Sequence, residues 1–198
     1  MEEELACMID LETVSTLPTA AIIEIGAHAF RLSVAGVGST AFLAQISQKH
    51  YKKDVTDNPF DIDPETVAWW LADPKRALHY RECMLSRISL RTALQDFSAW
   101  YGKCGFTSIW CRGASFDLAI LRHAYAAFDL KLPWAFRTER CSRTMLAHWD
   151  PSNELRPENN NWHSALSDAY AEIEHLQACQ QHKMAAPKLP SSLFETRL

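Results

Sequence analysis

Two acidic residues near the start of the chain, Asp10 and Glu12, have a spacing that points to chemistry. They follow residues 5–9, an apolar run that predicts a buried strand. Residues two apart on an extended chain point to the same face, so the two carboxylates converge while Leu11 points the other way. Converging acids at the end of a buried strand favour a divalent cation between them. For an isolated pair, two solvated acids in a turn would be the simpler explanation.

Three residues further along the chain supply matching groups. Asp117 follows a predicted strand at residues 106–111, in the first turn of a helix predicted over residues 115–128. This junction is a strand's carboxyl end, where the sites of open α/β sheets lie. His163 precedes Asp168 by five residues at the start of the last predicted helix. Both can belong to one site if the histidine side chain projects from the loop that leads into the helix. Taken singly, Asp117 can simply complement a helix dipole, and the other two can be solvated surface groups.

The elements that must position these residues predict an α/β domain with a mixed sheet. Residues 20–30 and 40–46 predict two strands after the first, joined by a hairpin connection, which makes the opening an antiparallel meander. Strands first, then strands alternating with helices, are typical of such a sheet flanked by helices. The predicted helices cover residues 64–73, a short stretch from Pro74, and residues 89–103, 115–128, 141–149 and 163–182.

The bulk composition narrows the function classes. A chain of 198 residues suits one domain, with residues 185–198 having the composition of a loosely ordered tail. Six scattered cysteines without a C-x-x-C pair favour reduced thiols in a cytoplasmic setting over disulfides or zinc. We expect no signal peptide and no membrane span. The net charge of −4 argues against coating long duplexes, yet allows an enzyme that grips a few nucleotides through metals.

The ordered set of acids and histidine resembles a known family. Over residues 5–178 its order and spacing are similar to the three motifs of the DnaQ-like, or DEDDh, 3′→5′ exonuclease superfamily, which implies an RNase H-like fold for residues 1–184. The matching motifs are Asp10-x-Glu12, Phe116-Asp117 and His163-x-x-x-x-Asp168. Within the superfamily, Glu65-Thr66-Val67-Ala68-Trp69-Trp70 and Arg143-Thr144 look like the branch that contains RNase AS.

The resemblance implies a two-metal hydrolysis. Two ions, Mg²⁺ or Mn²⁺, would be held by the four carboxylates, with Asp10 as the bridging ligand; oxygen ligands favour these hard cations. His163 would take the proton of the attacking water, since a free histidine pKa of about 6.5 lies near working pH. The implied substrates are single-stranded RNA or DNA 3′ ends, with RNA slightly favoured, and the products are nucleoside 5′-monophosphates. A homodimer is common in this branch.

The resemblance implies contacts of Leu11 and Thr13 with the terminal nucleotide, and the residue types suggest the other expected substrate contacts. Leu11 would act as an apolar wedge against the terminal nucleotide, and Phe116 could stack on a base. One ring of the Trp69–Trp70 pair is expected to stack on the terminal base, although packing in the core explains helical aromatics as well. Arg137, Arg140 and Arg143 form a local basic group that could steer a phosphate backbone, although a solvated protein face is the simpler explanation for these charges. The predicted contact residues are Leu11, Thr13, Trp70, Phe116 and Arg143.

Three other functions stay open at the level of sequence. The chain could be an inactive module that holds nucleic-acid ends, although nothing would maintain four converging carboxylates without metal. It could be a proofreading subunit whose proline-containing tail docks on a polymerase. It could also be a metal-dependent phosphatase that acts on small nucleotides.

Overall fold

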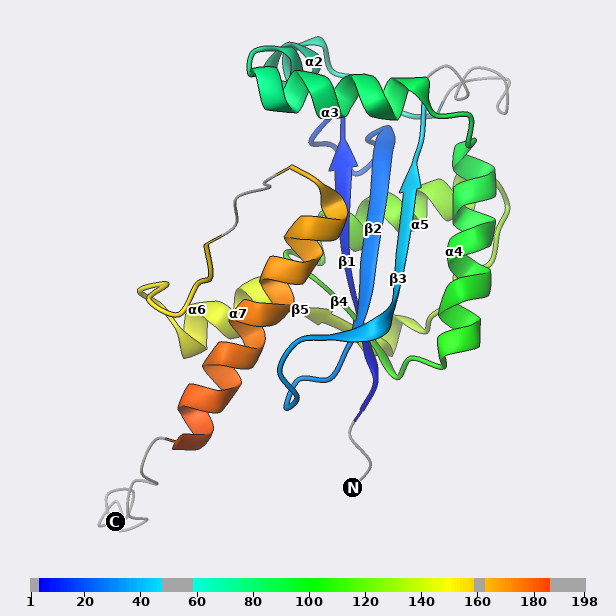
Figure 1. Ribbon diagram of the computed structural model, residues 1–198. Coiled ribbons are helices and arrows are strands. Elements are labelled where there is room, and N and C mark those ends of the chain that lie inside the picture. The colour runs from blue at the N-terminus through cyan, green and yellow to red at the C-terminus, as the bar shows by residue number, and fades with distance from the viewer. Residues whose placement is uncertain (1–3, 48–58, 159–162, 186–198) are drawn as a thin grey trace, which may run out of the picture.

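The computed structural model describes residues 4–47, 59–158 and 163–185, and its centre is a five-stranded mixed sheet (Figure 1). The strand order is β3-β2-β1-β4-β5. The first three strands pair antiparallel, and β4 and β5 run parallel to β1, so the predicted mixed sheet with an antiparallel opening is confirmed. The strands are β1 (Ala6–Thr13), β2 (Ile22–Phe30), β3 (Val37–Gln45), β4 (Ser108–Cys111) and β5 (Glu139–Cys141).

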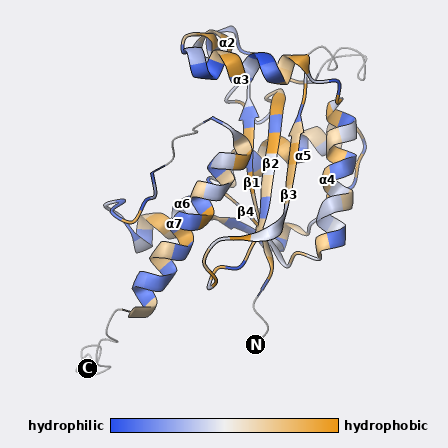
Figure 2. Cartoon of the chain, in the orientation of Figure 1, coloured by the Kyte–Doolittle hydropathy of each residue, from blue (hydrophilic) through white to orange (hydrophobic). Residues whose placement is uncertain are grey.

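Helices cover both faces of this sheet (Figure 1). Helix α7 crosses one face over β1 and β2, α4 and α5 lie behind the other face, and α2 and α3 lie across the end where β1 terminates. Each helix carries hydrophobic and hydrophilic residues together, as Figure 2 shows, because one side packs on the sheet and the other meets solvent. The helices are α2 (Pro64–Leu71), α3 (Pro74–Leu85), α4 (Leu90–Cys104), α5 (Asp117–Ala127), α6 (Ser142–Trp149) and α7 (Ala165–Ala185), with a 3₁₀ turn at Phe136–Thr138. None of the described helices is both long and apolar enough to cross a membrane.

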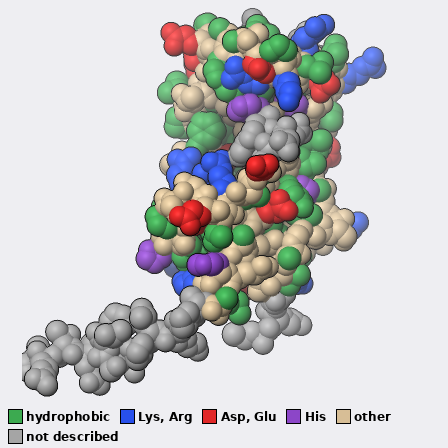
Figure 3. Space-filling model, turned by 60° about the vertical axis from the view of Figure 1, so that its left-hand side comes forward, with side chains coloured by type: hydrophobic (Ala, Val, Ile, Leu, Met, Phe, Trp, Pro, Cys, Tyr) green, Lys and Arg blue, Asp and Glu red, His purple; other side chains and the backbone are tan. Residues whose placement is uncertain are grey.

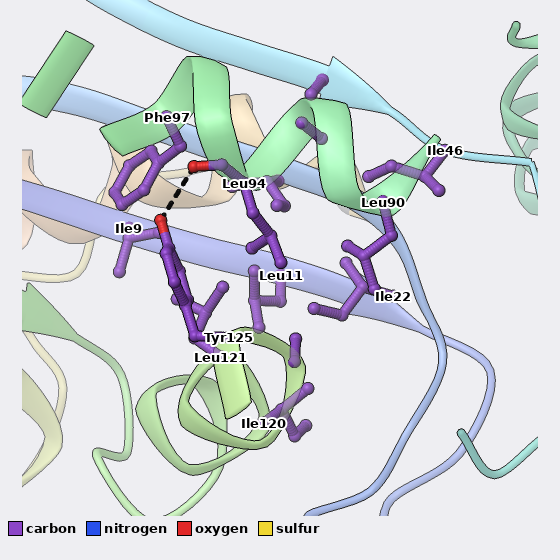
Figure 4. Close-up of a cluster of buried hydrophobic side chains, with 14 of the residues drawn as sticks. Ile9, Leu11, Ile22, Ile46, Leu90, Leu94, Phe97, Ile120, Leu121 and Tyr125 are labelled. Carbon is purple, nitrogen blue, oxygen red and sulfur yellow. Dashed lines mark hydrogen bonds between the residues drawn. The ribbon is translucent and has the colours of Figure 1, made fainter. Parts of the chain in front are cut away.

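The alternation of side chains along β1 decides where the acids point. Ile9 and Leu11 face the larger core between the sheet and α4 and α5 (Figure 4), whereas Met8 belongs to the smaller core under α7. Asp10 and Glu12 continue the face of Met8, because residues two apart share a face. Both acids therefore lie on the side of the sheet that α7 covers.

A glycine brings the start of α7 onto the sheet. Gly26 of β2 is the register partner of Asp10. A Cβ atom at Gly26 would lie 2.2 Å from the backbone nitrogen of Leu166 and 2.4 Å from the carbonyl carbon of Ala165. Only a residue without a side chain lets the helix backbone approach this closely, so the first turn of α7 stands directly beside Asp10.

Several element boundaries differ from those predicted. Strand β1 continues through Thr13, so the acid pair lies inside the strand rather than past its end, because Glu12 pairs with Glu24 of β2. Ser115 does not cap α5; the helix begins at Asp117 after Phe116, with no side-chain cap. Strand β5 was not predicted, since three residues carry little pattern without their partner β4.

The predicted tail can be compared only at its first residue. Helix α7 extends through Ala185, and residues 186–198 lie outside the described part of the chain. The predicted loop at residues 151–162 is described as far as residue 158, and no helix or strand interrupts it there. The division into a domain and a tail therefore stays a prediction.

Candidate active site

The structure brings the four predicted carboxylates together from three elements. Asp10 and Glu12 come from β1, Asp117 is the first residue of α5, and Asp168 lies in the first turn of α7. Burial raises the pKa of Asp10 and of Glu12 well above the ordinary range, and the neighbouring acids of the cluster raise them further. Burial also raises the pKa of Asp117 to about 7, against hydrogen bonds from backbone groups that lower it.

The cluster has the chemistry of a cation site. Among the described residues, no Lys, Arg or His forms an ion pair with Asp10, Glu12 or Asp117. Buried carboxylates without an ion-pair partner are costly, and their raised pKa values express that cost. Carboxylate oxygens are the ligands that Mg²⁺ and Mn²⁺ prefer, so these residues fit a hard divalent cation.

His163 lies at the edge of the same cluster. Ligand atoms of Glu12, His163 and Asp168 lie within 4.8 Å of one another. The histidine stands two residues before α7 in a left-handed conformation with φ of 68°, which its backbone N–H stabilises by donating to Asp168 Oδ2 at 2.9 Å. Burial, and next the positive charge of Arg76, lower the pKa of the His163 ring. A neutral imidazole beside the acids is able to accept a proton.

A cavity of about 560 Å³ opens next to Glu12. Four of the five predicted contact residues line it. Leu11 lies at its wall but is only 5% exposed, since it packs in the larger core. The Thr13 hydroxyl donates to the carbonyl of Ser15 at 2.7 Å. The contact residues that line the cavity are Leu11, Thr13, Trp70 and Phe116.

The two adjacent tryptophans have different environments. Trp70 is 1% exposed, and its Nε1–H donates to the carbonyl of Thr13 at 2.8 Å, so this ring is mainly part of the wall. Trp69 is 42% exposed; the Arg76 guanidinium lies 3.8 Å above its ring, and the His163 ring stands perpendicular to it at 4.9 Å. Both rings line the cavity, and Trp69 is the one of the pair that solvent reaches; the choice of Trp70 as the contact residue stays a prediction.

Arg143 lies outside the cavity but near the acids. It is exposed on α6, and its positive charge lowers the pKa of Asp117. Its Nη2 donates to the carbonyl of Arg112 at 3.2 Å, and a Cβ atom at Gly113 would lie 3.2 Å from the same nitrogen. Gly113 has φ of 111°, a conformation that favours glycine, so it permits both the turn after β4 and the approach of Arg143.

Two acids of the site were not predicted. Glu24 on β2 accepts from the backbone N–H of Ala165 at 2.8 Å and from His79 Nε2 at 3.1 Å, which ties α7 and α3 to the sheet. Glu172, one turn after Asp168, raises the pKa of Asp10 through its charge. The spacing of four residues after Asp168 would have indicated Glu172, since such residues share a helix face.

A comparison with protein families decides the assignment. A family model described as "3'-5' exoribonuclease Rv2179c-like domain" matches residues 6–180. The chain belongs to this family. It is accordingly a 3′→5′ exonuclease, as the motifs predicted. The family acts on nucleic acid, and nucleases of this type use divalent cations, for which the acids and His163 offer ligands.

Solved structures show the same fold. The nuclease domain of 3'hExo, "a DEDDh family member, bound to rAMP", has a TM-score of 0.61 at 12% identity, over 93% of this chain and 94% of that chain. Cell-death related nuclease 4 (CRN-4) has a TM-score of 0.59 at 12% identity over 92% of this chain, which spans 65% of the CRN-4 chain. A search of curated proteins found no match. The predicted RNase H-like fold is confirmed, whereas placement in the RNase AS branch stays a prediction.

Proposed function

We propose that this exonuclease releases nucleoside 5′-monophosphates from the 3′ end of single-stranded or 3′-overhanging nucleic acid, with RNA favoured over DNA. The observation that carries the proposal is the carboxylate cluster with His163 at its edge, beside a cavity of about 560 Å³. The description of the family as exoribonucleases supports RNA as the preferred substrate. A terminal nucleotide would enter the cavity, with its phosphate at the acids.

We further propose two divalent cations, Mg²⁺ or Mn²⁺, as cofactors. Asp10, Glu12, Asp117 and Asp168 would hold them. When bound, such ions polarise the scissile phosphate and stabilise the attacking and leaving oxygens of an in-line displacement. The proposal is supported by the raised pKa of Asp10, Glu12 and Asp117, because cations beside buried carboxylates favour their ionised form.

The protein's own groups then orient the substrate and move one proton. His163 accepts the proton of the attacking water, and its lowered pKa keeps the ring neutral and ready to do so. Trp69 offers an exposed ring at the cavity, whose position the Arg76 guanidinium holds from one face. Phe116 lines the same cavity and supplies a second aromatic surface for a base.

End-labelled RNA and DNA oligonucleotides of one sequence, incubated with Mn²⁺ or with EDTA, test the proposal. We expect mononucleotides from the 3′ end with Mn²⁺ alone, and faster release from RNA. Asp10→Asn should abolish the reaction, whereas Asp96→Asn, an exposed acid on α4, should leave it intact. Cleavage in EDTA, internal cleavage, or an active Asp10→Asn variant would contradict the proposed function.

A further inference from the structure

A second cavity, of about 140 Å³, adjoins the carboxylates on the other side of Asp10. Along β1, residues from Leu11 onward line the large cavity, whereas Met8, Ile9 and Asp10 line the small one. Asp168 also lines the small cavity. The acid cluster therefore separates two cavities that follow one another along the strand.

The small cavity has basic groups that the proposed chemistry has not used. Arg112, which follows β4, and Arg156, in the loop after α6, both line it. Arg112 Nη1 donates to Glu172 Oε2 at 2.7 Å, and Glu172 also accepts from the Ser142 hydroxyl, so the guanidinium is held in place. This ion pair uses one end of a planar group that carries five N–H donors. In Figure 3, where the side of α6 and α7 comes forward, Lys and Arg side chains gather midway along this face.

A buried histidine anchors the loop that carries Arg156. The carboxylate of Asp150 accepts from the backbone N–H groups of Glu154 and Leu155, both at 3.0 Å, and from His175 Nε2 at 2.8 Å. The turn is thereby fastened to α7 directly before Arg156. His175 is 1% exposed and lines the cavity, and its Nδ1 has no hydrogen-bond partner among the described residues. The lining thus includes a buried polar atom whose hydrogen-bonding capacity the described protein does not use.

We infer that the small cavity is a phosphate subsite, which binds the phosphodiester group next to the scissile bond on its 5′ side through Arg112 and Arg156. The inference rests on the proposed function. A strand with its terminal base in the large cavity and its scissile phosphate at the carboxylates continues past Asp10, which is where the small cavity lies. Guanidinium groups match phosphate oxygens in charge and geometry. The cavity's acids do not oppose this, since Glu172 pairs with Arg112 and the other two are cation ligands in the proposed mechanism.

The test compares two substrates of the full-length enzyme with Mn²⁺. One is an RNA oligonucleotide, and the other is a nitrophenyl ester of a nucleoside 5′-monophosphate, which has no second phosphate. Arg156→Ala should lower kcat/KM about tenfold more on the oligonucleotide than on the ester, and should lower the salt slope of oligonucleotide binding by about 0.7. Arg156→Lys should recover most of the loss, and Arg87→Ala, an exposed arginine that lines neither cavity, should change neither substrate.

Arg156 is the better probe because Arg112→Ala would leave the buried carboxylate of Glu172 without its cation. If Arg156→Ala lowers kcat/KM by the same factor on both substrates, or on neither, the subsite is overturned. The subsite would also be overturned if a free nucleoside 5′-monophosphate inhibited Arg156→Ala less strongly than the wild type while kcat/KM on the oligonucleotide stayed unchanged. The cavity would then hold the phosphate of the product. If the wild-type enzyme hydrolyses neither substrate, the proposed function fails instead.

Discussion

Asparagine in place of Asp117 should stabilise the metal-free protein while abolishing its activity. Asp117 is 3% exposed, and burial raises its pKa from the ordinary 3.8 to about 7. At about 1.4 kcal/mol for each pH unit, keeping this group ionised in the folded protein costs about 4 kcal/mol. The amide oxygen of asparagine can still accept the hydrogen bond from the Leu11 backbone, but it brings no charge beside Asp10. The variant should therefore gain up to about 4 kcal/mol.

The sign of this gain depends on pH. Below the unfolded-state value of 3.8 the carboxyl group is protonated in both states, and the variant has no advantage. Between 3.8 and about 7 the unfolded wild type has released its proton while the folded protein retains it, so wild-type stability falls as pH rises. Above about pH 7 the penalty is complete. The difference in unfolding free energy between Asp117→Asn and wild type should thus grow from near zero at pH 4 to its maximum at pH 8.

Urea unfolding in EDTA, followed by tryptophan fluorescence across this pH range, measures the difference. Added Mn²⁺ should stabilise the wild type strongly and the variant much less, because one ligand is lost. Asp96→Asn on the exposed side of α4 is the matched control and should change stability by less than about 0.5 kcal/mol at every pH. If Asp117→Asn is no more stable than wild type at pH 8 without metal, or its advantage is independent of pH, the electrostatic reasoning is wrong.

Three further predictions concern the site's supports. Gly26→Ala should lower the free energy of unfolding by several kcal/mol and remove most of the activity, because the new Cβ would clash with the α7 backbone. Gly102→Ala, which has open space around it, should instead raise the free energy of unfolding by about 0.5–1 kcal/mol, measured by thermal melts. Trp69→Ala should raise KM for oligonucleotides about 5- to 100-fold with little change in stability, whereas Trp70→Phe should lower stability by about 1 kcal/mol through the lost hydrogen bond; equal effects on KM would contradict this division. His163→Ala should lower kcat by roughly 10²–10⁴ while Mn²⁺ still raises the melting temperature, and a loss of that metal effect would instead make His163 chiefly a ligand.

Local patterns carried much of the prediction. The alternation of β1 alone implied that Asp10 and Glu12 share a face, because the side-chain period of a strand is two. Helices begin at Pro64 and Pro74 as predicted, each with its Pro at the first helical position. In the structure the preceding residues, Asp63 and Asp73, accept backbone N–H bonds as caps. Gly105 ends α4 with φ of 67°, as its place after a helical pattern indicates. Each of these depends on residues a few positions apart.

The motifs allowed predictions about residues that are far apart in the chain. Asp10-x-Glu12, Phe116-Asp117 and His163-x-x-x-x-Asp168 are far apart in sequence, and only their order and context predicted that they would meet. The structure gathers them because β4 is parallel to β1 and α7 packs on β1 and β2. The function class therefore followed from sequence, since a family's motifs record a three-dimensional arrangement.

Tertiary packing alone decided the remaining features. Trp69 and Trp70 are adjacent and of one type, so only the bond from Trp70 to the Thr13 carbonyl and the surroundings of each ring show which one solvent reaches. Glu24 anchors α7 from a strand 141 residues earlier, through a contact that no local pattern contains. The small cavity likewise depends on β4, α7 and the loop after α6 meeting beside Asp10. Sequence thus predicted which groups would form the acid cluster, whereas long-range contacts determined which neighbours hold them and which surfaces remain open to solvent.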